Sequence, residues 1–277
     1  MVVVLQAPAG CLGEGTDARR GREDGSGPPE RIVSLVPAVT EMLLELGARG
    51  RIVARTDSDP HPGLAALPSV GNPLAPSLEE LTASDPDLVI AWSGLDLSAM
   101  AADGLVQSIS IDRLADIGPA ITDVGRRIGE DENAAELRQS VMQRLRAADR
   151  RGQGARRPSL LWVVGSEPIV VAGPRTFIGD IMELVGGRNA AGSARTSWPM
   201  LGGETLLSLD PDVLVWSEGA GMFPHEQLGR RGPWSRLTSV RSNRVITVDG
   251  ARFHVPGPHI ASAALDLAHS LAELDRR

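Results

Sequence analysis

One stretch of the sequence occurs twice. Residues 77–92 read SLEELTASDPDLVIAW, and residues 202–219 read GGETLLSLDPDVLVWSEG. Six pairs of residues align at a constant offset of 125 positions: Glu79/Glu204, Leu81/Leu206, Asp85/Asp210, Pro86/Pro211, Asp87/Asp212 and Gly94/Gly219. Each copy predicts a short helix, an Asp-Pro-Asp turn and a strand whose apolar run is typical of buried parallel sheets. A fold that contains this unit twice is expected to have two similar halves.

A long helix is expected between the halves, because no Gly or Pro interrupts residues 131–151. Apolar residues recur there at spacings of three and four, which places them on one helix face: Ala134, Leu137, Val141, Leu145 and Ala148. Acidic residues stand at the start of this stretch and arginines near its end, an order that favours the helix dipole. About twenty residues at 1.5 Å each span roughly 30 Å, the width of a small domain.

The rest of the chain alternates between strand and helix patterns, which indicates an α/β fold. Before the long helix we expect strands within residues 31–36, 51–56, 87–92 and 107–111, and helices within 37–47 and 77–84. Ser77 is suited to be the N-cap of the second of these helices. After the long helix we expect strands within 160–165, 212–217 and 244–250, and helices within 175–187, 203–209 and 258–275. Pro258 suits the first turn of the closing helix.

We therefore predict an α/β protein of two similar α/β lobes, joined by a single long backbone helix, with a ligand cleft between the lobes. The predicted organisation is a flexible N-terminal tail (1–30), an N-terminal lobe (31–117), a bridging helix region (118–157) and a C-terminal lobe (158–277). Because bending the long helix would break packed turns, we expect it to limit how far the lobes move.

Composition excludes several kinds of chemistry. The 277 residues carry a net charge of -7, which argues against a broad nucleic-acid surface. Every basic residue is Arg, so a P-loop lysine and a Schiff-base lysine are absent. The single cysteine, Cys11, excludes an internal disulfide and a cysteine-based zinc site. Without a Gly-x-Ser-x-Gly or HExxH motif either, we expect a binding protein rather than an enzyme, with no catalytic residues and no resident cofactor.

The first thirty residues differ from the rest. Residues 1–11 read MVVVLQAPAGC, a short apolar stretch that ends in small residues and a cysteine, and a segment rich in Gly, Pro and charge follows. One interpretation is a lipoprotein leader whose true start lies upstream, with lipid on Cys11 as a membrane tether. The stretch lacks the positive start of a secretory signal, however, and carries Pro8. The alternative is an ordinary disordered tail, which would leave a cytosolic ligand carrier or sensor as a further hypothesis.

Three motifs together resemble the helical-backbone substrate-binding proteins of bacterial ABC importers. They are RIVSLVPAVTEMLLELG (31–47), DPDLVIAW (85–92) and SWPMLGGETLLSLDPDVLVW (197–216). The resemblance covers the chain from Arg31 to its C-terminus and is closest to the cobalamin-binding members, with ferric-siderophore and haem receptors as relatives. It implies a monomeric, periplasmic or otherwise extracytoplasmic protein that delivers a metal chelate to a permease dimer with its ATPase subunits.

The resemblance also implies roles for particular residues. Glu79 and Glu204, at the start of the two repeated helices, are expected to dock into arginine pockets of the permease. The residues expected to line the ligand cleft are Trp92, Trp198, Asp249, Phe253, Asp57 and His61. Each has a structural alternative: the glutamates would stabilise their own helices, the tryptophans would belong to the core, and Asp249 would hold a turn. Trp162 and Trp216 fall within strand patterns and are assigned to the core.

The ligand stays open at this point. Positions where the family often carries aromatic side chains hold Asp, Pro and His in the Asp57–His61 loop, and aliphatic residues at 169–171. Cobalamin, a ferric siderophore and haem are therefore all retained, and arginines near the cleft would suit an anionic chelate: Arg55, Arg195 and Arg252. The histidines are scattered, so no site for a bare metal ion is expected. His61 or His254 would serve as a single axial contact to the metal of a bound chelate.

Overall fold

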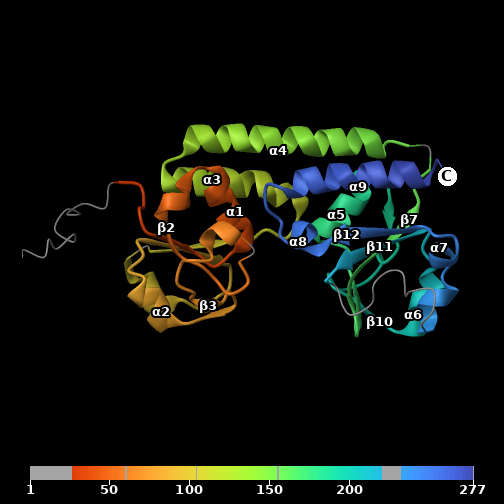
Figure 1. Cartoon of the computed structure of the whole chain (residues 1–277), viewed down its shortest axis with the longest axis horizontal. Helices are drawn as coiled ribbons and strands as arrows, with labels where there is room; N and C mark the ends of the chain where they lie inside the picture. Colours follow the sequence, from red (N-terminus) through yellow and green to blue (C-terminus); the bar gives the residue numbers. More distant parts are fainter. Residues whose placement is uncertain (1–26, 60, 104, 155, 220–231, 277) are drawn as a thin grey trace, which may run out of the picture.

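The computed structural model describes residues 27–59, 61–103, 105–154, 156–219 and 232–276. Two α/β lobes lie side by side, and the long helix α4 (Asp131–Gly152) runs across both of them (Figure 1). The predicted two-lobe α/β architecture with a single long backbone helix is therefore confirmed. Within the described residues, no helix is both long and apolar enough to cross a membrane.

The first lobe is built on a four-stranded parallel sheet. Its strand order is β2-β1-β5-β6, with bounds β1 (Ile32–Ser34), β2 (Ile52–Ala54), β5 (Leu88–Trp92) and β6 (Val106–Ile109). The helices of this lobe are α1 (Pro37–Glu45), α2 (Leu78–Ala83) and α3 (Ile117–Ile128). A small antiparallel pair, β3 (Gly71–Asn72) and β4 (Ala75–Pro76), leads into α2. Leu88, Val89 and Ile90 have no exposed surface, as expected for a central parallel strand.

The second lobe contains a mixed sheet of order β10-β8-β7-β11-β12, and β9 also pairs with β7. The bounds are β7 (Ser159–Ser166), β8 (Ile169–Val171), β9 (Arg188–Asn189), β10 (Met200–Leu201), β11 (Val213–Glu218) and β12 (Val245–Asp249). Its helices are α5 (Phe177–Leu184), α6 (Gly203–Leu209), α7 (Thr238–Arg241), α8 (Gly250–Phe253) and α9 (Ile260–Leu274). Trp162 and Trp216 are almost fully buried here, which confirms their assignment to the core.

The sequence repeat corresponds to one structural unit that occurs in each lobe. The unit β4-α2-β5 in the first lobe matches β10-α6-β11 in the second. In both Asp-Pro-Asp turns the first aspartate, Asp85 or Asp210, adopts a positive φ. The last aspartate of each turn accepts a backbone N–H from the start of the neighbouring strand: Asp87 from Arg31, and Asp212 from Ser159. The repeated aspartates therefore register two parallel strands against each other.

A second part of the duplication has a different offset, so a constant spacing does not detect it. The unit β1-α1-β2 matches β7-α5-β9, since β2 runs parallel to β1 and β9 runs parallel to β7. The second lobe differs in that β8 stands between β7 and α5. Both helices end before a glycine with positive φ, Gly47 (76°) and Gly186 (85°). Counted back from these glycines, Glu41 of α1 and Asp180 of α5 occupy the same position.

The long helix packs against both lobes. It contacts α3 of the first lobe and α5 and α9 of the second. Its predicted apolar stripe faces these helices, with Ala134, Val141, Leu145 and Ala148 buried. At one end Gly125 of α3 lies so close that a Cβ there would stand 2.2 Å from the Cβ of Ala134. At the other end a Cβ on Gly186 would stand 1.9 Å from the carbonyl oxygen of Gly152. Missing side chains therefore permit close contact at both ends of α4.

The short elements β3, β4, β8, β9, β10, α7 and α8 were not predicted, and two of the longer helices also differ from the prediction. No helix was expected at α3, which is amphipathic and packs between α4 and α1. The closing helix α9 begins at Ile260 with His259 as its N-cap, so Pro258 lies before its first turn. The physical reason is that Glu41 of the first lobe accepts the backbone N–H of His259 and fixes the helix start there.

We predict that Gly186→Ala destabilises the protein by at least about 2 kcal/mol, because the new Cβ meets the Gly152 backbone at a positive φ. Urea unfolding measures the change. Gly50→Ala is the matched control, since nothing lies within 4 Å of its Cβ position. Equal unfolding free energies for the two variants would contradict the close contact.

Candidate functional site

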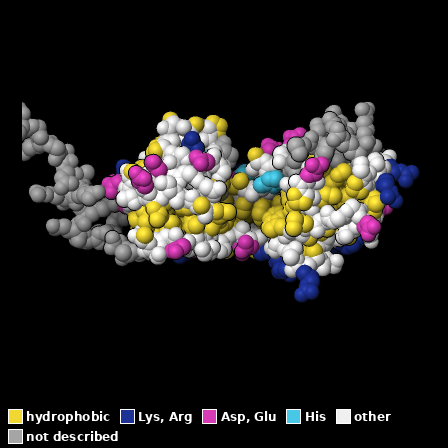
Figure 2. Space-filling model, turned by 90° about the horizontal axis from the view of Figure 1, so that it is seen from below, with side chains coloured by type: hydrophobic (Ala, Val, Ile, Leu, Met, Phe, Trp, Pro, Cys, Tyr) yellow, Lys and Arg dark blue, Asp and Glu magenta, His cyan; other side chains and the backbone are white. Residues whose placement is uncertain are grey.

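The surface between the lobes is hollowed and carries hydrophobic and histidine side chains, as Figure 2 shows from the face opposite α4. Three of the predicted ligand residues lie at or just beyond the carboxyl ends of parallel strands. Trp92 ends β5, Asp249 ends β12 and Asp57 follows β2. In open α/β sheets ligands bind at these carboxyl ends, so the positions agree with a cleft role.

The loop after β2 has a concentration of unsatisfied polar groups. Six buried side-chain polar atoms lack a hydrogen-bond partner within the part of the chain that is described, and three belong to this loop: Arg55 Nε, Thr56 Oγ1 and Asp59 Oδ2. Asp57 is exposed and accepts a hydrogen bond from the Ser69 hydroxyl. Because buried polar groups are nearly always paired, this loop is the strongest candidate in the first lobe for contact with a polar ligand group.

His61 in the same loop is oriented by a carboxylate. Its Nδ1 lies 2.9 Å from Asp59 Oδ1, and its backbone N–H donates to the same oxygen at 3.0 Å. The hydrogen bond to Asp59 raises the pKa of His61, although burial acts in the opposite direction. Burial alone would raise the pKa of Asp59, but the hydrogen bonds from His61 lower it. With Nδ1–H given to the carboxylate, His61 Nε2 has no hydrogen-bond partner among the described residues, the arrangement usual in metal-binding histidines.

The two predicted cleft tryptophans differ in exposure. Trp198 is 44% exposed, in the segment that leads into β10. Trp92 is partly buried and packs against the main hydrophobic core. Trp198 therefore has a free indole surface, whereas Trp92 offers only part of its ring.

Phe253 lies in the core, 3% exposed, with its ring 5.0 Å from that of Trp162 in an edge-on contact. A direct contact between Phe253 and a ligand stays a prediction that this placement does not favour. Trp162 Nε1–H donates to Ser217 Oγ at 2.8 Å, and Ser217 Oγ lies 3.1 Å from His254 Nε2. Since the serine accepts from the indole, its own proton is free to go to His254, whose Nε2 is then occupied.

Burial lowers the pKa of His254, with the nearby Asp249 acting against this effect. Part of the residue still reaches solvent. Asp249 is exposed and caps α8, because its Oδ1 accepts the Ala251 N–H at 2.9 Å. The residue therefore holds the turn, and its second carboxylate oxygen is available for other contacts. Of the three arginines considered for an anionic ligand, Arg252 is paired with Asp266 at 2.8 Å. Arg55 donates to the Thr56 carbonyl oxygen, and Arg195 is exposed.

Comparison with known proteins decides the family. The model of the periplasmic binding protein family matches residues 32–251. The chain belongs to the periplasmic binding protein family. This agrees with the expectation of a binding protein rather than an enzyme.

Named relatives of this binding protein cover most of its length. The uncharacterized ABC transporter substrate-binding lipoprotein YvrC of Bacillus subtilis is 26% identical, over 88% of this chain and 80% of its own. The cobalamin-binding protein of Halobacterium salinarum is also 26% identical, over 98% of this chain and 82% of its own. The solved structure of the periplasmic heme-binding protein RhuT from Roseiflexus sp. RS-1 has the same fold, with a TM-score of 0.78, 24% identity and coverage of 88% and 98%.

The repeated glutamates of this binding protein are both exposed. Glu79 and Glu204 lie in the first turns of α2 and α6, are exposed, and make no ion pair with another described residue. Both helices lie on the side of the lobes away from α4 (Figure 1). Five large hydrophobic side chains are exposed within the described residues, and four of them stand near the starts of α2 and α6: Leu74, Leu78, Trp198 and Met200.

Among the residues that the structure describes, two side-chain contacts join the lobes directly, and sequence reasoning missed the residues of both. Glu41 of α1 bonds to His259, and Asp180 of α5 bonds to Arg113 and Leu114. The sequence did contain a signal for these residues, because Glu41 precedes Gly47 by the same number of residues as Asp180 precedes Gly186. This match is found only when the two halves are aligned at a different offset from that of the Asp-Pro-Asp repeat.

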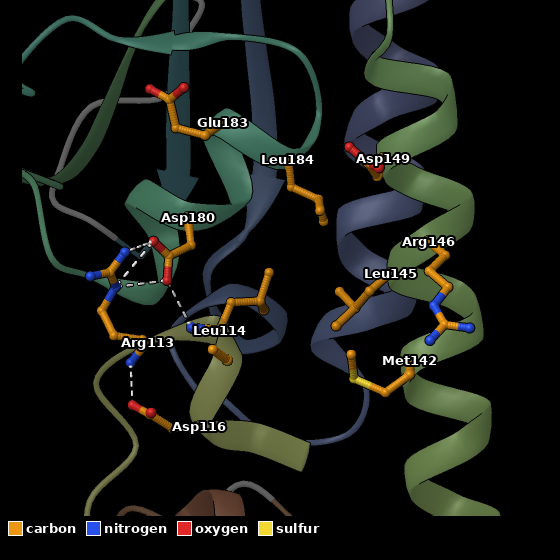
Figure 3. A pocket seen from close by; sticks show the side chains of 11 residues that line it. Arg113, Leu114, Asp116, Met142, Leu145, Arg146, Asp149, Asp180, Glu183 and Leu184 are labelled. Atoms are coloured by element: carbon orange, nitrogen blue, oxygen red, sulfur yellow. Dashed lines mark hydrogen bonds and ion pairs between the residues drawn. The ribbon is translucent and has the colours of Figure 1, made fainter. Parts of the chain in front are cut away.

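The Arg113–Asp180 contact borders a cavity of about 600 Å³ between α4, α5 and residues 113–116 (Figure 3). Both apolar and charged side chains line it. The apolar lining includes Leu114, Met142, Leu145 and Leu184. None of the predicted ligand residues lines it, so it is separate from the cleft loops described above.

We predict opposite pH dependences for two histidine variants. The raised pKa of His61 stabilises the folded state below the ordinary histidine pKa, and this contribution is lost as pH rises through the raised value. His61→Gln should therefore cost more unfolding free energy at about pH 5.5 than at about pH 8.5. The lowered pKa of His254 weakens the folded state as pH falls, so His254→Gln should cost less at the lower pH. Urea unfolding at both pH values checks this, and equal costs for His61→Gln would refute it.

Proposed function

We propose that this protein is the solute-binding component of an ABC importer, and that it captures cobalamin or a related metal chelate between its lobes and delivers it to a permease. The observation that carries the proposal is the pair of exposed glutamates, Glu79 and Glu204, at equivalent positions of two duplicated units. A duplicated carboxylate on one side of the molecule suits a partner with two-fold symmetry. The family assignment and the lipoprotein and cobalamin-binding relatives support the same function.

A flat macrocyclic ligand fits the side chains available between the lobes. The exposed indole of Trp198 offers an apolar plane, with the partly buried Trp92 at the end of β5 in the other lobe. Aromatic rings cover much of such a ligand and lose little conformational entropy on binding. Asp57 and Asp249 would accept hydrogen bonds from polar groups at the ligand's edge. Cobalamin is our first candidate because of the Halobacterium relative, and haem is the second because of the heme-binding neighbour.

His61 is the better of the two candidates for an axial contact to the chelate's metal. Its Nδ1–H is held by Asp59, which leaves Nε2 free, whereas Nε2 of His254 already faces Ser217. The raised pKa of His61 means that a metal competes with a proton for Nε2, so this contact would strengthen as pH rises.

Docking to the permease would combine charge with apolar contact. Glu79 and Glu204 would steer and register the two partners, since exposed charges act mainly on encounter and orientation. Leu78 is 44% exposed beside Glu79, and Met200 is 72% exposed shortly before Glu204. These side chains would supply area that becomes buried on docking. We infer that a single copy of this chain meets a permease dimer, because one chain already presents both halves of the pseudo-symmetric surface.

The proposed function requires a location outside the cytoplasmic membrane, as in the periplasmic and lipoprotein relatives. A lipid on Cys11 would tether the protein there. Cys11 and the rest of residues 1–26 lie outside the described residues, so the anchor remains a prediction from the sequence.

We predict that tryptophan fluorescence is quenched by one of three probes: cyanocobalamin, haemin or a ferric hydroxamate. Trp198→Ala should weaken that binding by about tenfold, which corresponds to roughly 1.4 kcal/mol for a stacked aromatic contact. Met142→Ala is the control, because Met142 is an exposed hydrophobic residue on α4 at the separate cavity. Saturable binding to none of the three probes would overturn the ligand assignment.

We predict that Glu79→Arg combined with Glu204→Arg abolishes transport while affinity for the ligand stays unchanged, because both residues lie on the proposed docking side. Uptake of labelled ligand into proteoliposomes that contain the transporter measures the first effect, and the fluorescence titration measures the second. Glu80→Arg combined with Thr205→Arg is the matched control, since these exposed neighbours occupy the next turn positions. Lost ligand affinity in the double glutamate variant would refute the docking role.

A further inference from the structure

A buried carboxylate of the first lobe reaches into the second. Glu41 of α1 is 6% exposed. Its Oε1 accepts the backbone N–H of His259 at 2.5 Å, and its Oε2 contacts Nδ1 of the same histidine. His259 is the N-cap of α9, which packs along α4. The contact therefore ties a helix of the first lobe to the start of a helix of the second.

A carboxylate of the second lobe reaches back in the same manner. Asp180 of α5 accepts the backbone N–H of Leu114 at 2.9 Å and the Arg113 Nε–H at 2.8 Å (Figure 3). Arg113 and Leu114 belong to the segment between β6 and α3 of the first lobe. As in the Glu41 contact, one carboxylate holds both a backbone N–H and the side chain of a cationic residue type.

The two carboxylates are equivalent in the internal duplication. Each stands six residues before the positive-φ glycine that ends its helix, Gly47 or Gly186. One contact runs from the first lobe to the second and the other runs in return, so together they resist both separation and twisting of the lobes. We propose that Glu41 and Asp180 are positioning residues that set the separation of the lobes, and through it the width of the ligand cleft. The link to the cleft rests on the proposed function, whereas the lobe separation does not.

Gly257 shows how closely the Glu41 contact is built. A Cβ on Gly257 would stand 2.2 Å from Glu41 Oε2 and 2.8 Å from its Cδ. Gly257 does not have a positive φ, so alanine is compatible with its backbone. The atom that must move is the free end of the Glu41 side chain. Gly257→Ala is therefore expected to expel the carboxylate from His259 without changing any charge.

The two contacts differ in their need for a proton. His259 Nε2 lies 2.9 Å from the Arg252 carbonyl oxygen, which only accepts, so Nε2 carries a hydrogen. The contact between Nδ1 and Glu41 then requires one more proton, on either the ring or the carboxylate. Arg113 is charged at every ordinary pH, and its hydrogen bond to Asp180 raises its pKa further. The side-chain part of the Glu41 contact therefore depends on that proton, whereas the Arg113 guanidinium always carries the protons that it donates.

Other charged groups surround both contacts and must be considered with them. Glu41 acts electrostatically on His61, which is itself held by Asp59. Arg252, whose carbonyl oxygen accepts the hydrogen bond from His259 Nε2, forms an ion pair with Asp266 of α9. Beside Asp180, the cavity rim carries Asp116 as well as Arg146 and Asp149 of α4.

Spin labels measure the lobe separation directly. In the full chain with Cys11→Ser, cysteines replace the equivalent exposed residues Glu80 and Thr205, one in each lobe. Pulsed electron–electron double resonance should give one narrow distribution of label-to-label distances for this doubly labelled protein. Gly257→Ala, Glu41→Gln and Asp180→Asn should each broaden it, and Glu41→Gln combined with Asp180→Asn should broaden it most.

Two controls separate positioning from loss of stability. Asp212→Asn removes a carboxylate that also holds a backbone N–H and a side chain, but within one lobe. Gly118→Ala adds a Cβ that makes only ordinary contacts at 3.8 Å. Both should leave the distribution narrow even where they lower the unfolding temperature. An unchanged distribution in the Glu41→Gln, Asp180→Asn double variant would overturn the proposal.

The ligand provides an independent readout. Whichever probe binds the parent protein should bind the Glu41→Gln, Asp180→Asn double variant at least about fivefold more weakly. If no probe binds the parent protein, the proposed function fails while the distance measurements still decide the positioning role.

Discussion

The close packing of α4 at its two ends is the constraint on which the rest of the structure depends. Gly125 meets Ala134 near the start of the helix, and Gly186 meets Gly152 at its end. Each lobe is therefore seated on the same rigid rod rather than on a flexible linker. A helix resists bending because its hydrogen-bonded turns would have to break. Whatever binds between the lobes thus meets two surfaces whose spacing is set largely before it arrives.

A preset spacing is useful to a binding protein of this family. Fixing the two surfaces in advance lowers the entropy cost of capturing a ligand, and less of the binding free energy is spent on closing the cleft. It also keeps Glu79 and Glu204 at a constant distance, so that one rigid surface would meet a permease in the proposed docking. The direct contacts of Glu41 and Asp180 also act on the separation of the two lobes.

Much of the fold could be predicted because its signals are local. The stripe of Ala134, Val141 and Leu145 follows the helical period, and the Asp-Pro-Asp turns are legible from residue type alone. The residues of the candidate site were harder to predict from the sequence. Trp92 and Phe253 look alike as aromatic residues near strand ends, yet one is half-buried and the other is packed on Trp162. The amphipathic helix α3 was missed as well, although its pattern was present in the sequence.

The sequence by itself determined the duplicated α/β units, the long helix between them and the absence of lysine chemistry and of an internal disulfide, because composition and short-range periodicity are properties of the chain alone. Only the tertiary structure decided which carboxylates cross between the lobes. Glu41 and His259 are 218 positions apart and Arg113 and Asp180 are 67 apart, and no local pattern connects them. Such pairs arise when separately formed elements pack together, since packing alone brings a buried carboxylate to its distant donors.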